Sequence, residues 1–328
     1  MKFRRFCLKA VVLCLLFLPF SSPAPLIYRP GEGWTYEAVG GGGKWQRARA
    51  KEQLDVAQAA FDHKDYGLAL KAARRVTSVW PFSDYAPKAR YLVGRCYQAK
   101  GKDEKAFKEY DRLVSRSPKL ENYDEIVQRE YEIANEYLAG KRFTLWGLVP
   151  LYRSMDRTAE MFDKIVKSGP YSDVAPQAQL KIGAARDKQK NYSAAVKAYE
   201  LAADRYADRP KIAAEALYRQ AMSYYKQAMT AEYDQTSAGQ AISTFTDFMT
   251  LFPEDPRCSE GQRIIGSLKS EQARGSFETA KFYEKYYRWK GALVYYNEVL
   301  IQDPKSQYAE IAKERIDSLK KRIEKGTP

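Results

Sequence analysis

Few side chains in this sequence have the chemistry that catalysis requires. His63 is the only histidine among 328 residues, which nearly excludes histidine-dependent metal sites, catalytic triads and imidazole acid–base catalysis. The surrounding FDHKD (61–65) is typical of a surface turn between two helices. We find no phosphate-binding loop, no Cys/His cluster and no pair of carboxylates isolated in an apolar setting. The sequence therefore predicts no catalytic, cofactor-binding or metal-binding residue, and a protein that is not an enzyme.

Basic and aromatic residues recur together, and this pattern favours binding over catalysis. The chain has 25 tyrosines and a formal net charge of +14. A lysine or arginine can pair with the C-terminal carboxylate of an extended peptide, while a tyrosine ring packs on an aromatic last residue. The opposing interpretation is that these residues form solvated helix faces. The candidate peptide-binding groove comprises Lys51, Gln58, Lys88, Tyr91, Arg95, Gln128, Tyr131 and Asn135.

The apolar pattern after Lys44 predicts that helices position these residues almost everywhere. One sequence motif recurs along the chain. It has alanine, an apolar or aromatic residue four positions later and an apolar residue seven positions later, with proline shortly afterwards. Helices upstream carry a small residue followed three positions later by tyrosine, as at Gly94 and Tyr97. The small residue lets two helices approach closely, and proline ends the second helix. The marker alanines are Ala69, Ala106, Ala159, Ala195, Ala241 and Ala292.

This is the tetratricopeptide pattern, whose parent period is about 34 residues. It predicts an all-α tetratricopeptide-repeat α-solenoid of about six helix pairs, with a C-terminal capping helix over 306–325. One pair cannot bury its apolar face alone, so the stack forms a continuous core with a concave side lined by the first helix of each pair. We place the candidate groove on that side. The intervals 140–153 and 230–239 indicate extended helices or loops.

Residues 1–24 have the three parts of a secretory signal peptide, namely a basic start, a short apolar run and small residues. The apolar run is too short to span a bilayer as a permanent helix. We expect cleavage near Ser22 or Ala24, with an uncleaved N-terminal anchor as the alternative. Residues 25–43 are predicted to be a flexible peptide with a glycine tether, and 44–328 the repeat solenoid. Export makes nucleic acid a poor partner for this basic chain, and an anionic envelope surface or acidic peptide termini better ones.

Two of the four cysteines, Cys7 and Cys14, fall inside the predicted signal peptide. Neither stands just after the apolar run, where a lipid-acceptor cysteine would be needed, so the sequence predicts export without lipid attachment. Cys96 and Cys258 lie far apart in the predicted stack, beyond the reach of a disulfide. We expect both to be buried free thiols.

Four blocks resemble the family of BamD, also called YfiO, the helical-repeat component of the machine that inserts β-barrel proteins into bacterial outer membranes. The most specific block, AKFYEKYYRWKGALVYYNEV (280–299), is similar to the family's final repeat. WPFSDYAPKARYLVGRCY (80–97) is similar to its first inter-repeat segment. The other blocks are 115–124 and 155–173, and the resemblance covers about residues 45–320.

The resemblance implies a non-enzymatic periplasmic scaffold at the inner face of the cell outer membrane. Its partners would be a BamA-like barrel-assembly protein and unfolded barrel precursors, which typically end in an aromatic residue as the groove chemistry requires. Since the family's C-terminal repeats contact other assembly components, the resemblance suggests Arg288, Trp289 and Lys290 as partner-binding residues. Trp289 could equally be a turn residue packed inward. The alternative function is a periplasmic tetratricopeptide adaptor for cell-wall remodelling or polysaccharide export.

The chain departs from the family pattern at two places. The family is usually lipidated, and this sequence has no good lipid-acceptor cysteine. Lys290 and Glu298 stand where the family's last repeat often has arginine. We therefore expect a divergent relative whose partner contacts differ at this end.

Overall fold

The computed structural model describes residues 26–36, 45–117, 120–145, 149–230 and 235–324. The chain divides into two compact units, Met1–Ile126 and Val127–Pro328, and the division falls inside one helix, α6 (Tyr123–Ala139). The predicted signal peptide (1–24), with Cys7 and Cys14, and the predicted glycine tether lie outside the described residues.

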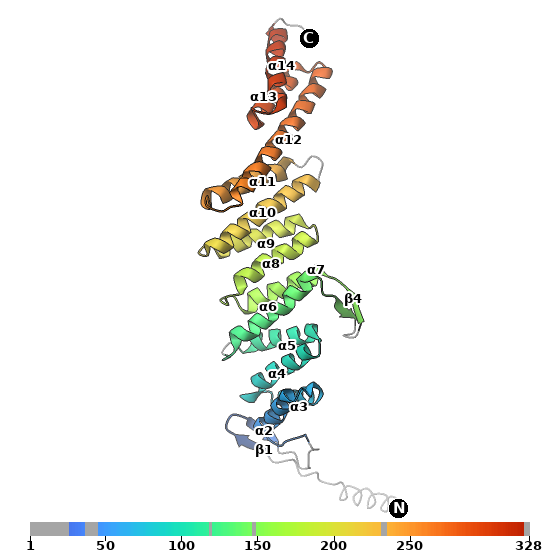
Figure 1. Cartoon of the computed structure of the whole chain (residues 1–328), viewed down its shortest axis with the longest axis vertical. Helices are drawn as coiled ribbons and strands as arrows, with labels where there is room; N and C mark the ends of the chain where they lie inside the picture. Colours follow the sequence, from blue (N-terminus) through green and yellow to red (C-terminus); the bar gives the residue numbers. More distant parts are fainter. Residues whose placement is uncertain (1–25, 37–44, 118–119, 146–148, 231–234, 325–328) are drawn as a thin grey trace, which may run out of the picture. The chain divides into compact units, whose positions relative to one another are not determined.

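In the first unit a hairpin precedes two helix pairs, and each helix packs against the next (Figure 1). Its elements are β1 (Leu26–Arg29), β2 (Gly33–Tyr36), α2 (Ala50–Asp62), α3 (Tyr66–Val79), α4 (Tyr85–Ala99) and α5 (Asp103–Arg116), followed by the start of α6.

The hairpin replaces part of the flexible peptide that the sequence predicts over 25–43. β1 and β2 pair antiparallel, from Leu26 opposite Tyr36 to Arg29 opposite Gly33. Gly31 and Gly33 adopt φ angles of 78° and 73°, which glycine reaches without steric cost. The backbone N–H of Asp84 donates to the Gly31 carbonyl oxygen at 2.8 Å, so the hairpin is joined to the turn before α4. Periodicity missed this element because its strands are only four residues long.

The second unit continues with helices that again follow one another side by side, from green α7 to red α14 in Figure 1. Its elements after α6 are β3 (Phe143–Leu145), β4 (Val149–Tyr152), α7 (Met155–Ser168), α8 (Ala175–Lys188), α9 (Tyr192–Arg205), α10 (Pro210–Thr230), α11 (Gln235–Leu251), α12 (Cys258–Lys285), α13 (Trp289–Gln302) and α14 (Gln307–Glu324).

The turn inside several helix pairs has one repeated backbone geometry. A single residue has a left-handed φ, and the following N–H donates to the carbonyl five residues earlier, which closes the first helix as a Schellman motif. Asp65 and Asn191 then cap the second helix through their side-chain oxygens. Only one of the four turns places glycine at the left-handed position. The four residues are Lys64 (φ 61°), Gly101 (65°), Lys190 (59°) and Tyr287 (57°).

The second unit also contains a short hairpin, where the sequence predicts only an insertion of loop or helix over 140–153. β3 pairs antiparallel with β4. The Phe143 ring is buried and stacks on Tyr137, with the ring centroids 4.3 Å apart. The guanidinium of Arg157, on α7, lies 4.4 Å from the centroid of the same Phe143 ring. Aromatic packing therefore fixes the insertion to helices α6 and α7.

The predicted all-α tetratricopeptide-repeat fold is confirmed. Within the described residues, helices α2 to α13 form six consecutive pairs, and α14 follows as the C-terminal helix. All six marker alanines are at most 1% exposed, as expected for residues at close helix–helix contacts. α14 buries Ala312, Ile316 and Leu319 against α12 and α13, which gives the expected capping arrangement.

Cys96 and Cys258 are free thiols, as predicted. Cys96 is buried, and burial raises the pKa of its thiol to about 11. Cys258 is only half-buried, and its sulfur lies 3.2 Å from the Phe252 carbonyl oxygen. The prediction of two buried thiols is therefore right for Cys96 alone.

Candidate peptide-binding site

Three candidate residues belong to α4, namely Lys88, Tyr91 and Arg95. They lie on one face of that helix, because spacings of three and four residues place side chains one above another. Arg95 is the centre of the group. The Cζ atom of Arg95 lies 5.2 Å from the Phe61 ring centroid and 5.7 Å from that of Tyr91. Its Nη1 also donates to the Tyr91 hydroxyl at 3.2 Å. α2 and α4 together thus hold a cation against two aromatic rings.

Two acidic residues outside the predicted set accompany this face. The Tyr91 hydroxyl donates to Glu125 Oε1 at 2.6 Å. Lys88 Nζ lies 3.8 Å from Glu121 Oε2, and both side chains are mostly exposed, so this ion pair is weak. Within the described part of the chain, no carboxylate lies within ion-pair distance of Arg95. Arg95 is therefore the cation of this face best placed to accept a ligand carboxylate.

Lys51 and Gln58 are exposed on α2, two turns apart. The Gln58 side-chain amide donates to Asp62 Oδ1 at 2.9 Å. A ligand would have to displace this bond to reach the amide nitrogen of Gln58, whereas it could reach Lys51 directly.

The remaining groove residues, Gln128, Tyr131 and Asn135, belong to the second unit and are described there by themselves. The Tyr131 ring packs edge-on against Phe162, with the centroids 5.9 Å apart. Asn135 donates to the Tyr131 carbonyl oxygen at 2.9 Å, and Gln128 donates to a neighbouring carboxylate on α6. Tyr131 and Asn135 are half-buried and Gln128 is exposed.

The candidate partner residues lie at the start of α13. Arg288 and Lys290 are exposed, whereas Trp289 is half-buried. The Trp289 ring packs edge-on against Tyr287 at 5.3 Å, and the Arg322 guanidinium lies 5.4 Å from its centroid. Trp289 also borders the core cluster of α12, α13 and α14. The inward-packed interpretation of Trp289 therefore describes its position.

A cavity of about 840 Å³, which the sequence does not predict, opens beside Trp289. Tyr287 is 72% exposed and Phe282 58% exposed at its wall, so aromatic surface faces solvent here. The signal available in the sequence was the concentration of aromatic residues in 277–296, which predicts core as readily as surface.

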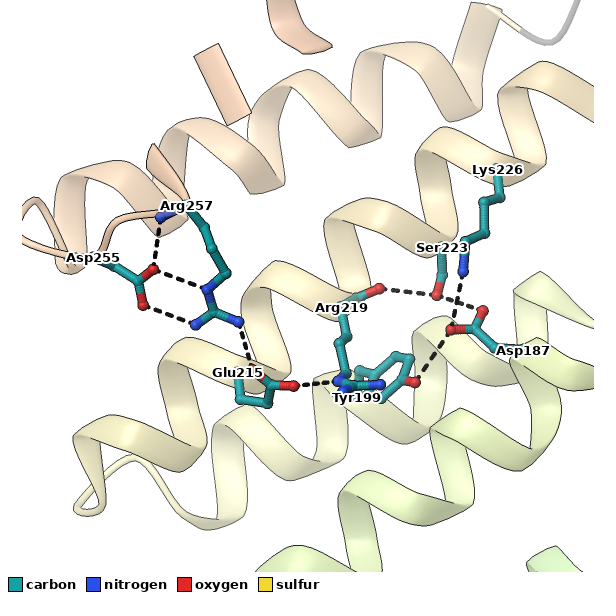
Figure 2. Close-up of polar contacts among 8 residues, drawn as sticks. All are labelled: Asp187, Tyr199, Glu215, Arg219, Ser223, Lys226, Asp255 and Arg257. Atoms are coloured by element: carbon teal, nitrogen blue, oxygen red, sulfur yellow. Dashed lines mark hydrogen bonds and ion pairs between the residues drawn. The ribbon is translucent and has the colours of Figure 1, made fainter. Parts of the chain in front are cut away.

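A polar network that the sequence also failed to indicate links α8, α9 and α10 with the turn before α12 (Figure 2). The Asp187 carboxylate accepts from the Tyr199 hydroxyl at 3.2 Å and from the Ser223 hydroxyl at 2.9 Å, and Lys226 Nζ lies 3.5 Å from it. These partners come from helices up to 39 residues away in sequence. Local periodicity carries no information about such pairings.

The other half of the network places one carboxylate between two guanidinium groups. Figure 2 shows Glu215 between Arg219 and Arg257, and both donate to it. Burial opposes ionisation of Glu215, but hydrogen bonds and charges from the two arginines outweigh it and lower the pKa of the carboxyl group. Arg257 also binds Asp255 through two guanidinium nitrogens, each at 2.8 Å, and these bonds lower the Asp255 pKa. The network is thus a set of charge-assisted contacts between repeats.

No described helix is both long and apolar enough to cross a bilayer. The described His, Cys, Asp and Glu side chains nowhere gather in a group of three or more that could hold a metal ion.

Two protein families match parts of the sequence. Residues 152–312 match the family YfiO, described as an outer membrane lipoprotein. Residues 88–119 match a tetratricopeptide repeat family. Among curated proteins, none matches the sequence significantly.

Solved structures that resemble the chain share little sequence with it. The C-terminal part of a tetratricopeptide protein from Cytophaga hutchinsonii is 15% identical, and the match covers 80% of this chain and 87% of that one, with a TM-score of 0.35. A tetratricopeptide protein from Parabacteroides merdae is 13% identical over 82% of this chain and 98% of that one, with a TM-score of 0.33. MamA from Desulfovibrio magneticus is 14% identical over 63% and 97%, with a TM-score of 0.32.

Proposed function

Because the chain is a YfiO-like tetratricopeptide-repeat protein, we propose that it is a non-enzymatic scaffold of outer membrane β-barrel assembly. The match of residues 152–312 to the outer membrane lipoprotein family carries this proposal. In it, the chain works in the periplasm at the inner face of the outer membrane. Its partners are unfolded barrel precursors and a BamA-like assembly protein.

The first unit would receive the end of a precursor at the α4 face. Arg95 supplies the cation for a terminal carboxylate, and a charge-assisted bond to guanidinium is strong because both groups are ionised. Phe61 and Tyr91 supply ring surfaces for an aromatic last residue. Lys51, Lys88 and Gln58 would contact the preceding residues of the extended peptide.

In the second unit we assign Gln128, Tyr131 and Asn135 to precursor contacts as well. Asn135 and Gln128 already bond within α6. Arg288 and Lys290 are the exposed cations beside the C-terminal aromatic surface, and we assign them to the assembly partner. Trp289 would support this surface from beneath, because it packs against Tyr287 and Arg322.

A pull-down from envelope extract tests the scaffold role. The purified protein is expected to retain a barrel-assembly protein, and the double variant Arg288→Glu/Lys290→Glu is expected to retain much less of it. Recovery of cell-wall or polysaccharide-export factors alone would contradict barrel assembly and favour an adaptor for those processes. Lys305→Glu together with Lys313→Glu gives a control of equal charge change on exposed residues near the same end of the chain.

A labelled peptide with a C-terminal phenylalanine tests the α4 face. Arg95→Gln is expected to weaken its binding about tenfold, since the variant loses the charge-assisted bond to the carboxylate. Fluorescence anisotropy measures the affinity, and an amidated form of the peptide should bind the wild-type protein as weakly as the free acid binds the variant. Arg116→Gln, on the exposed end of α5, is the matched control. Equal affinities of wild type and Arg95→Gln for the peptide would contradict the assignment of its binding to the α4 face. The scaffold role would then be tested by the pull-down alone.

A further inference from the structure

A second cation-rich site lies in the second unit, apart from the candidate peptide-binding and partner-binding residues. Helices α8 and α10 enclose a cavity of about 250 Å³. They are the first helices of their pairs, and they also contact one another directly. We call this cavity the α8–α10 pocket and define it by Lys181, Lys211, Glu215 and Arg219.

The charges around the pocket do not balance. Glu215 is the carboxylate in its wall, and Arg219 and Arg257 already donate to it. Asp255 in turn binds Arg257, so these two acids and two arginines compensate one another. Lys181 and Lys211 remain. No described carboxylate lies within ion-pair distance of either lysine, so the pocket carries a net positive charge that favours an anion.

The other walls restrict the kind of anion. Leu180 and Ile212 are nearly buried and line the same cavity, so a ligand needs apolar atoms next to its charge. A carboxylate on a short aliphatic stem fits these apolar walls better than an inorganic phosphate group does, because its methylene groups can pack against Leu180 and Ile212.

We propose that the α8–α10 pocket binds a carboxylate of a polypeptide, either an Asp or Glu side chain or a chain terminus. Lys181 and Lys211 pair with the carboxylate, and Leu180 and Ile212 pack against its methylene groups. The inference goes beyond the proposed function, because it concerns a separate site and requires no particular partner. In this proposal the second unit binds acidic segments of an extended partner polypeptide.

Fluorescence anisotropy with three labelled peptides tests the pocket on the full chain. One peptide contains glutamates and is amidated, the second has glutamine in their place, and the third is the glutamine peptide with a free C-terminal carboxylate. The glutamate peptide is expected to bind at least tenfold more tightly than the amidated glutamine peptide. Tight binding of the third peptide to the Arg95→Gln protein, whose α4 face has lost its cation, would identify the chain terminus as the source of the carboxylate.

Variants connect this binding to the pocket. Lys181→Gln/Lys211→Gln should weaken binding of the acidic peptide about tenfold, and Lys181→Arg/Lys211→Arg should preserve it. Lys197→Gln/Lys269→Gln removes the same charge from exposed positions elsewhere in the second unit and should have little effect. Equal weakening by the pocket and control variants would overturn the inference, since the attraction would then be nonspecific. Inorganic phosphate that displaces the peptide at equal concentration would also overturn it. Arg95→Gln should leave this binding unchanged, so failure here is separable from failure at the α4 face.

Discussion

At the scale of single residues, position in the repeat stack decides what a charged side chain does. Arg257 is bound on one side by Asp255 and on the other by Glu215, and its Cζ lies 4.5 Å from the Tyr218 ring centroid. Lys88 has a mostly exposed partner 3.8 Å away and is correspondingly free to leave it. Both are basic residues near the start of a helix. Only the first is an integral part of the fold.

Asp255→Asn should lower the free energy of unfolding by about 1 kcal/mol at pH 7, because it removes charge-assisted bonds to Arg257 while keeping the side-chain shape. The folded-state pKa of Asp255 lies below its ordinary value. Its contribution is therefore complete above the unfolded pKa of about 3.9 and lost as the pH falls through the folded value. Urea titrations at pH 7 and pH 3 should show a difference between variant and wild type that shrinks on acidification.

Asp208→Asn is the control, since Asp208 is exposed in the turn between α9 and α10. A stability difference for Asp255→Asn that stays constant between pH 7 and pH 3 would contradict the role assigned to its carboxylate.

At the scale of helices, one interlocking contact recurs in three pairs. A small residue on the first helix receives a tyrosine from the second helix, and the tyrosine hydroxyl donates to a side chain one turn after the small residue. The tyrosines are fully buried, which accounts for part of the unusual tyrosine content. The three sets are Gly94 with Gln98 and Tyr110, Gly183 with Asp187 and Tyr199, and Ala280 with Glu284 and Tyr296, where Ala280 and Tyr296 belong to one core cluster.

Gly183→Ala tests this contact. A Cβ atom at Gly183 would lie 2.4 Å from the Tyr199 ring, so ring or backbone must move. We expect a destabilisation of about 1–3 kcal/mol, the usual range for overpacking. Gly266→Ala is the control, because a Cβ there meets nothing within 4 Å and should stabilise α12 by about 0.5–1 kcal/mol. Thermal unfolding should separate the two variants in opposite directions, and a Gly183→Ala protein as stable as wild type would contradict the contact.

At the scale of the whole molecule, the helices α2 to α5 of the first unit and α7 to α14 of the second pack mainly against their neighbours in sequence, as expected for stacked repeats. Each unit therefore has its own chain of contacts. In the second unit the charged network spans three successive helices and the turn before α12, so it joins successive repeats alongside their shared apolar core. Stability in such an arrangement is approximately a sum of repeat and interface contributions.

Hydrogen exchange can test this nearest-neighbour coupling. In Gly183→Ala, amide protection should fall in α8 and α9 and in the adjacent α10, because the altered contact lies between α8 and α9 and α10 packs on α9. Protection of α13 should remain that of wild type. An equal fall in every helix of the second unit would instead indicate one cooperative unfolding step.

The common helix face of the three candidate residues of α4 could be predicted from the sequence, but the contacts around them could not. The spacing of Lys88, Tyr91 and Arg95 places them on one helix face, and this depends only on the helical period. That Arg95 lies against Phe61, and that Glu121 and Glu125 face Lys88 and Tyr91, depends on how neighbouring elements pack. The α8–α10 pocket was missed for the same reason, since Lys181 and Lys211 belong to different repeats.

The amino-acid sequence by itself determined the succession of helix pairs. Marker alanines and the capping residues Asp65 and Asn191 act over a few positions, so their effect is readable along the chain. Tertiary structure alone decided which charges are compensated, which aromatic rings remain exposed and where a cavity forms. The physical reason is that these properties depend on distances between side chains of different helices, and rotation of one helix against the next sets those distances without changing either local pattern.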